Sequence, residues 1–173
     1  MSATSTRPVD AATTAEARAW RALGAVPDPE IPVLSVVDLG VIRWVRAAAR
    51  GVVVGLSPTY SGCPATAVIR ASVVAALEAD GLAPVAVEEV LSPPWTSDWI
   101  SPDGRRRLAE YGIAPPAEPV GSPRALWQAH APISCPRCGS RATTELSAFG
   151  STPCKALHRC DSCREPFEYF KCI

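Results

Sequence analysis

The chain lacks an excess of charge of either sign. It carries 17 Lys and Arg residues against 17 Asp and Glu residues, so its formal net charge is zero. General binders of nucleic acid or of anionic membrane surfaces need a positive excess, so this balance argues against both classes. Long apolar runs are also missing: none could span a membrane, and Met1–Asp10 lacks the apolar core of a signal peptide. We therefore expect a cytoplasmic protein that binds neither membranes nor nucleic acid.

Histidine is scarce, since the chain contains only His130 and His158. An enzyme that attacks its substrate with a cysteine generally needs a neighbouring base, most often a histidine. His130 falls in a proline-rich stretch and His158 falls among the C-terminal cysteines. Neither histidine is close in the sequence to Cys63, the first cysteine of the chain. We therefore expect no catalytic residue, and a protein that is not itself an enzyme.

The chain does contain seven cysteines, an odd number that does not fit a complete disulfide framework. Two C-x-x-C pairs, Cys135 with Cys138 and Cys160 with Cys163, are separated by 21 residues. Each pair can bend into a knuckle, and two knuckles make the tetrahedral four-thiolate site that zinc prefers. The span 135–173 is too short to fold on a hydrophobic core alone, so metal ligation would supply folding energy. We predict a zinc ribbon whose zinc is structural, because four thiolates leave no open coordination position.

Cys154 and Cys172 leave the complete ligand set open. Cys154 could replace a ribbon ligand, and the two cysteines could also belong to a second, labile metal site. Both could equally be small packing residues, as most free cysteines are. Soft thiolates hold iron or an iron–sulfur unit as readily as zinc, so the residue types do not distinguish these metals.

The remaining cysteine lies in the stretch Thr59-Tyr-Ser-Gly-Cys-Pro-Ala-Thr66. Gly62 permits a tight turn, and Pro64 suits the first position of a helix, where its missing N–H costs nothing. Cys63 is thus predicted at a helix N-terminus, where free N–H groups and the helix dipole favour the thiolate. A thiolate attacks electrophiles or binds metals, so we predict a reactive or metal-binding Cys63. The alternative is a small buried apolar residue.

Three acidic residues, Asp28, Glu30 and Asp38, lie in and after the segment Pro27-Asp-Pro-Glu-Ile-Pro-Val33. Its alternating prolines force an extended, stiff backbone. The acidic residues could therefore support a site or only form turns, since Asp favours turns and helix caps. The sequence leaves both interpretations open.

The apolar patterns predict a compact α+β domain with the element order α, β, β, α, β, α. We expect helices near 13–23, 65–79 and 101–111, and strands near 41–47, 51–56 and 84–91. The predicted organisation is a disordered N-terminus over 1–10, the α+β domain over 11–113, a Pro-rich linker over 114–134 and the zinc ribbon over 135–173.

Two stretches give the chain a family resemblance. Asp28-Pro-Glu-Ile-Pro-Val-Leu, together with Thr59-Tyr-Ser-Gly-Cys-Pro-Ala-Thr, resembles the SufT-like domain of iron–sulfur cluster assembly factors. Three later motifs narrow the resemblance to the PaaD (PaaJ) family of phenylacetate-degradation proteins, accessory components of the phenylacetyl-CoA epoxidase. They are Pro94-Trp-Thr-Ser-Asp-Trp-Ile, Tyr111-Gly-Ile-Ala-Pro-Pro, and the stretch from Phe149-Gly-Ser-Thr-Pro-Cys to the terminal Phe170-Lys-Cys-Ile. The resemblance covers about residues 20–173.

The resemblance implies a role in assembling a metal centre of the epoxidase, with its oxygenase and reductase components as partners. The family's reactive cysteine falls on Cys63, as a ligand for transient iron or an iron–sulfur cluster. The supporting acidic and turn residues fall on Asp28, Glu30, Asp38, Thr59 and Gly62, and the zinc ligands on Cys135, Cys138, Cys160 and Cys163. A single cysteine cannot complete a cluster site, so a homodimer or a complex with a client is expected.

Three other functions remain open from the sequence. The chain could be a non-catalytic scaffold of the oxygenase, a thiol enzyme using Cys63, or a nucleic-acid-binding ribbon. Six cations give the ribbon local positive charge, but four acidic residues offset most of it. We rank the metal-centre assembly role first and these three after it, in the order given.

Overall fold

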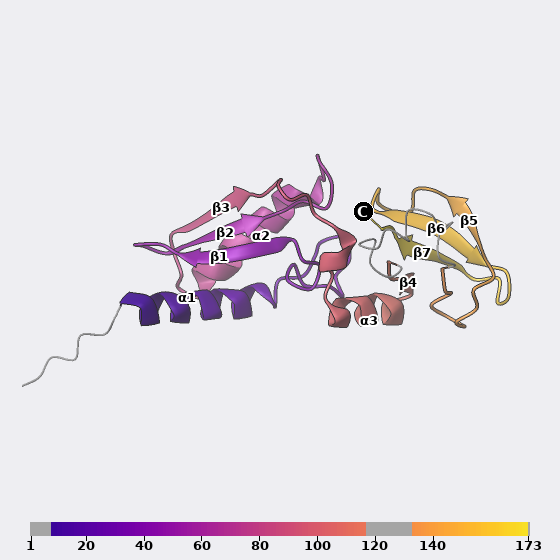
Figure 1. Cartoon of the computed structure of the whole chain (residues 1–173), viewed down its shortest axis with the longest axis horizontal. Helices are drawn as coiled ribbons and strands as arrows, with labels where there is room; N and C mark the ends of the chain where they lie inside the picture. The colour runs from indigo at the N-terminus through magenta and orange to yellow at the C-terminus, as the bar shows by residue number, and fades with distance from the viewer. Residues whose placement is uncertain (1–7, 117–132, 173) are drawn as a thin grey trace, which may run out of the picture. The chain divides into compact units, whose positions relative to one another are not determined.

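The computed structural model describes residues 8–116 and 133–172 (Figure 1). The chain forms two compact units, Met1–Pro94 and Trp95–Ile173. The predicted disordered N-terminus falls partly, and the predicted linker largely, on residues outside this description. No helix among the described residues is long and apolar enough to cross a membrane.

The first unit contains two helices and one three-stranded sheet. Its elements are α1 (Pro8–Leu23), β1 (Ile42–Ala47), β2 (Val52–Leu56), α2 (Ala65–Ala79) and β3 (Val85–Glu89). The strand order is β1-β2-β3, with β1 antiparallel to β2 and β2 parallel to β3. A parallel pair cannot be joined by a tight hairpin, so α2 forms the crossover between β2 and β3.

Helical spacing of apolar residues explains how α2 packs. Ala65, Ile69, Val73 and Leu77 recur every four residues, share one face and are buried. Both helices contact the sheet and each other, so they cover the same face of it. Val54 at the centre of that face has no exposed surface. This face holds the core of the unit.

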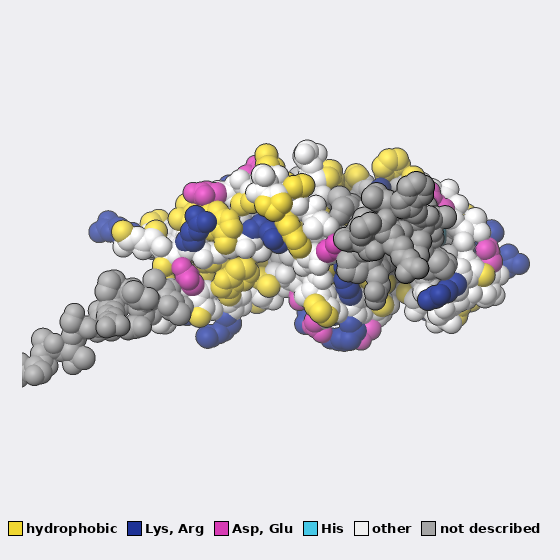
Figure 2. Space-filling view, in the orientation of Figure 1, with side chains coloured by type: hydrophobic (Ala, Val, Ile, Leu, Met, Phe, Trp, Pro, Cys, Tyr) yellow, Lys and Arg dark blue, Asp and Glu magenta, His cyan; other side chains and the backbone are white. Residues whose placement is uncertain are grey.

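The opposite face of the sheet carries an aromatic side chain. Trp44 pairs with Gly55 across β1 and β2, and a Cβ atom at Gly55 would lie 2.2 Å from the Trp44 ring. Only glycine therefore leaves room for the indole. Arg46 lies over the Trp44 ring at 4.1 Å from its centroid. Figure 2 shows hydrophobic side chains with Lys and Arg side chains among them on the surface of this unit.

The second unit is built on a four-stranded sheet. Its elements are η1 (Ser97–Trp99), α3 (Pro102–Tyr111), β4 (Ile113–Ala114), β5 (Thr143–Ser147), β6 (Lys155–Cys160) and β7 (Pro166–Phe170). The strand order is β4-β7-β6-β5, and β4 runs parallel to β7.

The structure thus groups α3 and β4 with the C-terminal strands. The predicted domain boundary after residue 113 places α3 in the first domain instead, and no strand is predicted at β4. The physical reason is pairing: the backbone of Ile113 and Ala114 is hydrogen-bonded to β7. Trp95 also packs in this unit, with its ring centroid 6.0 Å from that of Phe170. The α3 boundaries themselves follow the predicted pattern, since the Ser101 hydroxyl caps the N–H of Gly104 at 2.9 Å. The predicted α+β class is confirmed.

An ion pair between buried Lys155 and half-buried Glu168 holds the connection between β5 and β6. Lys155 is 3% exposed, and its Nζ lies 2.8 Å from Glu168 Oε2. Glu168 Oε1 accepts a hydrogen bond from the backbone N–H of Ser151 at 2.5 Å. Burial alone would raise the pKa of Glu168, but the hydrogen bonds from Lys155 and Ser151 outweigh it and hold that pKa below its usual value. The pair therefore contributes fully at neutral pH and is lost as the pH falls through the folded-state pKa of Glu168.

The α2 packing predicts a cavity effect. Leu77→Ala should lower the free energy of unfolding of the first unit by about 2–5 kcal/mol, because Leu77 is fully buried. Val68 lies on the same helix but is 52% exposed, so Val68→Ala should change it by less than about 0.5 kcal/mol. Urea unfolding followed by circular dichroism checks this, and equal effects of the two changes would contradict the packing.

The ion pair predicts a different pattern. Glu168→Gln leaves the buried Lys155 ammonium without its counter-ion and should destabilise the second unit by about 3–5 kcal/mol. The double change Lys155→Met with Glu168→Leu should recover most of that loss, because no charge then remains buried. Urea unfolding of both variants measures the difference, and a double variant as unstable as the single one would argue against the explanation.

Candidate functional site

The turn before α2 presents Cys63 at the surface of the first unit. Gly62 adopts a positive φ of 83°, as the tight turn requires. The Cys63 N–H donates to the Tyr60 carbonyl at 3.2 Å, and the Thr66 N–H donates to the Cys63 carbonyl at 3.2 Å. Pro64 is the residue flanking the helix, with helical φ and ψ, and α2 begins at Ala65. Cys63 is half-buried and so remains within reach of a ligand.

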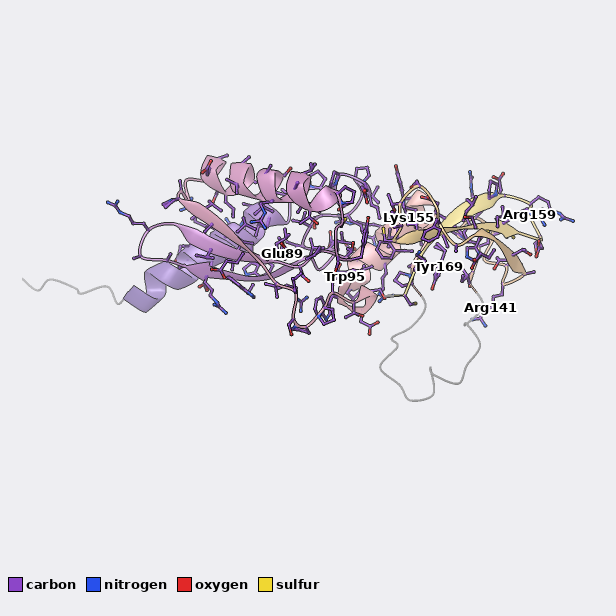
Figure 3. The ribbon with its side chains drawn as sticks, turned by 90° about the horizontal axis from the view of Figure 1, so that it is seen from above. Glu89, Trp95, Arg141, Lys155, Arg159 and Tyr169 are labelled. Carbon is purple, nitrogen blue, oxygen red and sulfur yellow. The ribbon has the colours of Figure 1, made fainter. Side chains whose placement is uncertain are left out.

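A pocket of about 340 Å³ opens at this turn. Its lining includes Cys63 and Gly62 from the turn, Thr66 and Arg70 from α2, and Glu89 at the end of β3. These residues come together because β2 and β3 are parallel: the crossover helix begins at the edge of the sheet where both strands end. Open sheets with parallel strands commonly place ligands at this edge. Figure 3 labels Glu89 at its position in the first unit.

The sequence patterns did not identify the two charged residues of this pocket, Arg70 and Glu89. Arg70 is the only cation in the sequence of α2. Its Nη1 donates to the backbone carbonyl of Val87 in β3 at 2.5 Å, so the guanidinium is anchored at the sheet edge. A single cation within an apolar helix is the signal that could have identified Arg70. Glu89 could be found only once β3 was known to run parallel to β2.

The predicted acidic residues have contacts typical of turns. Asp28 is buried, and its Oδ1 accepts hydrogen bonds from the backbone N–H groups of Glu30 at 2.9 Å and Ile31 at 2.8 Å. Asp38 Oδ2 accepts a hydrogen bond from the Ser35 hydroxyl at 2.9 Å. These residues do not line the Cys63 pocket, and neither does Thr59. Of the predicted supporting residues, the pocket lining includes only Gly62.

The second unit brings four cysteine sulfurs together. The Sγ atoms of Cys135, Cys138, Cys160 and Cys163 all lie within 4.8 Å of one another. The Cys135–Cys163 and Cys138–Cys160 distances are 3.7 and 3.6 Å. A tetrahedral zinc with Zn–S bonds of about 2.3 Å requires sulfurs about 3.8 Å apart. The residues present therefore fit a zinc ion.

The two knuckles have matching backbone geometry. The Cys135 N–H donates to the Ser140 carbonyl at 2.9 Å, and the Cys160 N–H donates to the Glu165 carbonyl at 3.0 Å. Each knuckle contains one residue in the left-handed region, Gly139 with φ 74° and Arg164 with φ 67°. Cys135 and Cys160 are buried, so the cluster is part of the core of the unit.

The two thiols of the second knuckle have pKa values shifted in opposite directions. Hydrogen bonds from the backbone N–H of Cys163 and of Ser162 lower the pKa of Cys160 to about 6. The backbone N–H of Glu165 would lower the pKa of Cys163, but partial loss of hydration and the three neighbouring thiols raise it to about 12. Thiols that crowd together cannot all ionise unless a cation binds between them. The arrangement is that of a site completed by a metal ion.

Cys154 and Cys172 are not part of the four-sulfur group. Cys154 is buried, with its Sγ 3.1 Å from the Thr152 hydroxyl. Cys172 is exposed, with its Sγ 3.2 Å from the Tyr169 hydroxyl. The described geometry therefore gives each of them a neighbouring hydroxyl, and their role as extra ligands stays a prediction.

The cluster predicts a folding requirement for metal. Cys160→Ser should abolish binding of about one zinc ion per chain and unfold the second unit, because ligation supplies its folding energy. The matched control Cys172→Ser should keep both the metal and the fold. Metal analysis and near-ultraviolet circular dichroism measure these effects, and a folded, metal-free Cys160→Ser protein would contradict the prediction.

Comparisons with known proteins agree with this division into two parts. The "Iron-sulfur cluster assembly protein" family matches residues 16–92, and the "PaaD zinc beta ribbon domain" family matches residues 120–171. The crystal structure of a domain of unknown function, DUF59, from Bacillus anthracis is 26% identical, with a TM-score of 0.54. The match covers 58% of this chain and 96% of that one, and it supports the fold of the iron–sulfur assembly type.

A curated protein of Escherichia coli (strain K12) is similar over nearly the whole chain. Its name describes it as one subunit of a "Putative 1,2-phenylacetyl-CoA epoxidase", and it is 53% identical over 156 residues. The match covers 89% of this chain and 91% of that protein. The family resemblance noted in the sequence and the predicted zinc ribbon are thereby confirmed. The chain belongs to the PaaD family of phenylacetyl-CoA epoxidase subunits, with an iron–sulfur cluster assembly domain followed by the PaaD zinc ribbon.

Proposed function

We propose that the chain is a maturation factor of the phenylacetyl-CoA epoxidase, and that Cys63 is the residue which carries its metal cargo. The observation that supports this most is the open pocket around Cys63, in the part of the chain that matches iron–sulfur cluster assembly proteins. The thiolate of Cys63 would hold iron or an iron–sulfur unit transiently. The pocket is open to solvent, which suits release to a client.

The client would be an oxygenase or reductase component of the epoxidase. One cysteine supplies one ligand, so the other ligands of the cargo would come from the client or from a second copy of the chain. Such incomplete coordination favours transfer, because ligands of the client can replace Cys63 one at a time. Asp28 and Asp38 would support the site indirectly by fixing the turns that they hydrogen-bond.

The zinc ribbon would act as a structural module and as a docking surface for the client. The zinc would be held by Cys135, Cys138, Cys160 and Cys163. It would cross-link the two knuckles, and four thiolates would leave it no open coordination position. Cys138 and Cys163 are exposed, so the outer side of the metal site lies at the surface of this unit.

A scaffold role without metal transfer is the second candidate. The observation in its favour is that the Escherichia coli relative is named as a subunit of the epoxidase. A scaffold needs the ribbon and the fold of the first unit, but it does not need the thiol of Cys63. The two functions therefore differ in whether they require the sulfur atom of Cys63.

Replacing the Cys63 sulfur with oxygen distinguishes the maturation role from the scaffold role. The epoxidase components, produced with the Cys63→Ser chain, should have the low activity and low iron content of components produced without the chain. The control Cys172→Ser changes an exposed cysteine of the second unit and should support full activity. Full epoxidase activity with Cys63→Ser would remove the maturation role of Cys63 and leave the scaffold.

A further inference from the structure

Arg70 supplies a fixed positive charge inside the pocket. It is half-buried, and its Nη1 donates to the Val87 carbonyl at 2.5 Å. A guanidinium has five N–H donors, so this bond uses a small part of its capacity. The described residues provide no second hydrogen-bond partner for it. The remaining donors are available to a ligand in the pocket that Arg70 lines.

The two charged side chains of the pocket differ in their exposure to solvent. Glu89 is exposed, whereas Arg70 is half-buried. The other side chains of the lining, apart from the Cys63 thiol, are not ionisable. Charge interactions are stronger where water is partly excluded, so Arg70 outweighs Glu89 for a ligand that enters the pocket. A bare cation would be repelled by Arg70, and an anion would be attracted.

We propose that the pocket takes its cargo as an anionic, thiolate- or sulfide-ligated iron unit, with Arg70 donating hydrogen bonds to the sulfur of that unit. This inference rests on the proposed carrier function of Cys63. Arg70 is then a specificity-determining residue that distinguishes a preassembled iron–sulfur unit from a free ferrous ion. Hydrogen bonds between a guanidinium and an anionic acceptor are about twice as strong as neutral ones.

Loading is a ligand exchange without electron transfer. The bond between iron and one thiolate of the donor breaks, and a bond between iron and Cys63 Sγ forms. The proton of the Cys63 thiol passes to the departing thiolate, so the net charge of the bound unit is unchanged. Arg70 offsets that charge before and after the exchange.

The test compares two probes on the full chain under anaerobic conditions. One probe is ferrous ion alone, and the other is a glutathione-ligated iron–sulfur complex of net negative charge. Arg70→Gln keeps an amide that can donate to Val87 but removes the charge. We expect it to weaken binding of the anionic complex about tenfold, while ferrous ion binds at least as tightly as before. Arg70→Lys, which restores the charge, should bind the complex within about threefold of the wild type.

Matched controls come from charged residues of the first unit that do not line the pocket. Arg50→Gln removes an exposed cation outside the pocket, and Glu88→Gln removes the carboxylate next to Glu89 in β3. Both should leave binding of the two probes unchanged. Glu89→Gln should not weaken binding of the anionic complex. Circular dichroism shows whether each variant is folded. If Arg70→Gln does not fold, the wild type still tests the proposal, because sodium chloride should weaken its binding of the anionic complex.

Two results would overturn the inference. Salt-insensitive binding of the complex, or equal binding by Arg70→Gln, would show that Arg70 does not act on the cargo. Tighter binding of ferrous ion than of the complex, lost in Glu89→Gln, would indicate a cation site made by Cys63 and Glu89. In either case the proposed function stands if Cys63→Ser still prevents maturation. It falls only if Cys63→Ser supports full epoxidase activity.

Discussion

The parallel pairing of β2 with β3 is the constraint on which the Cys63 pocket depends. Parallel strands need a crossover, and the crossover is α2, whose apolar face fills the core through Ile69, Val73 and Leu77. This geometry places the start of α2 beside the end of β3, so Cys63 and Glu89 line one pocket although they are far apart in the sequence. Arg70 then ties the helix to the sheet edge through the Val87 carbonyl. The α2 crossover thus both fills the core and brings the residues of the pocket together.

The second unit depends on a different constraint, the convergence of four sulfurs. Its hydrophobic core includes Cys135 and Cys160 together with Ala114 and Phe167, so the metal ligands are themselves core residues. Ala114 belongs to β4, which adds the segment after α3 to the ribbon sheet. The pair of buried Lys155 with half-buried Glu168 fixes the connection between β5 and β6.

Much of this organisation could be predicted from local patterns. The Gly62-Cys63-Pro64 turn indicates the start of α2, and the two C-x-x-C pairs indicate the cluster, because each signal is confined to a few neighbouring residues. Features that depend on distant pairing could not be predicted. The strand β4 contains only Ile113 and Ala114, and so short a strand cannot be recognised without its partner β7. Arg70 and Glu89 become site residues only when β3 is placed beside β2. Asp28 could have been assigned to a turn or to a site, and its hydrogen bonds to the N–H groups of Glu30 and Ile31 favour the turn.

We propose that one chain holds two metals in different ways, a permanent zinc in the ribbon and a transient iron unit at Cys63. The most direct test is metal and acid-labile sulfide analysis of protein purified without oxygen, wild type beside Cys63→Ser. We expect about one zinc ion per chain in both proteins, with iron and sulfide in the wild type only. Zinc alone in both proteins would contradict the carrier role of Cys63.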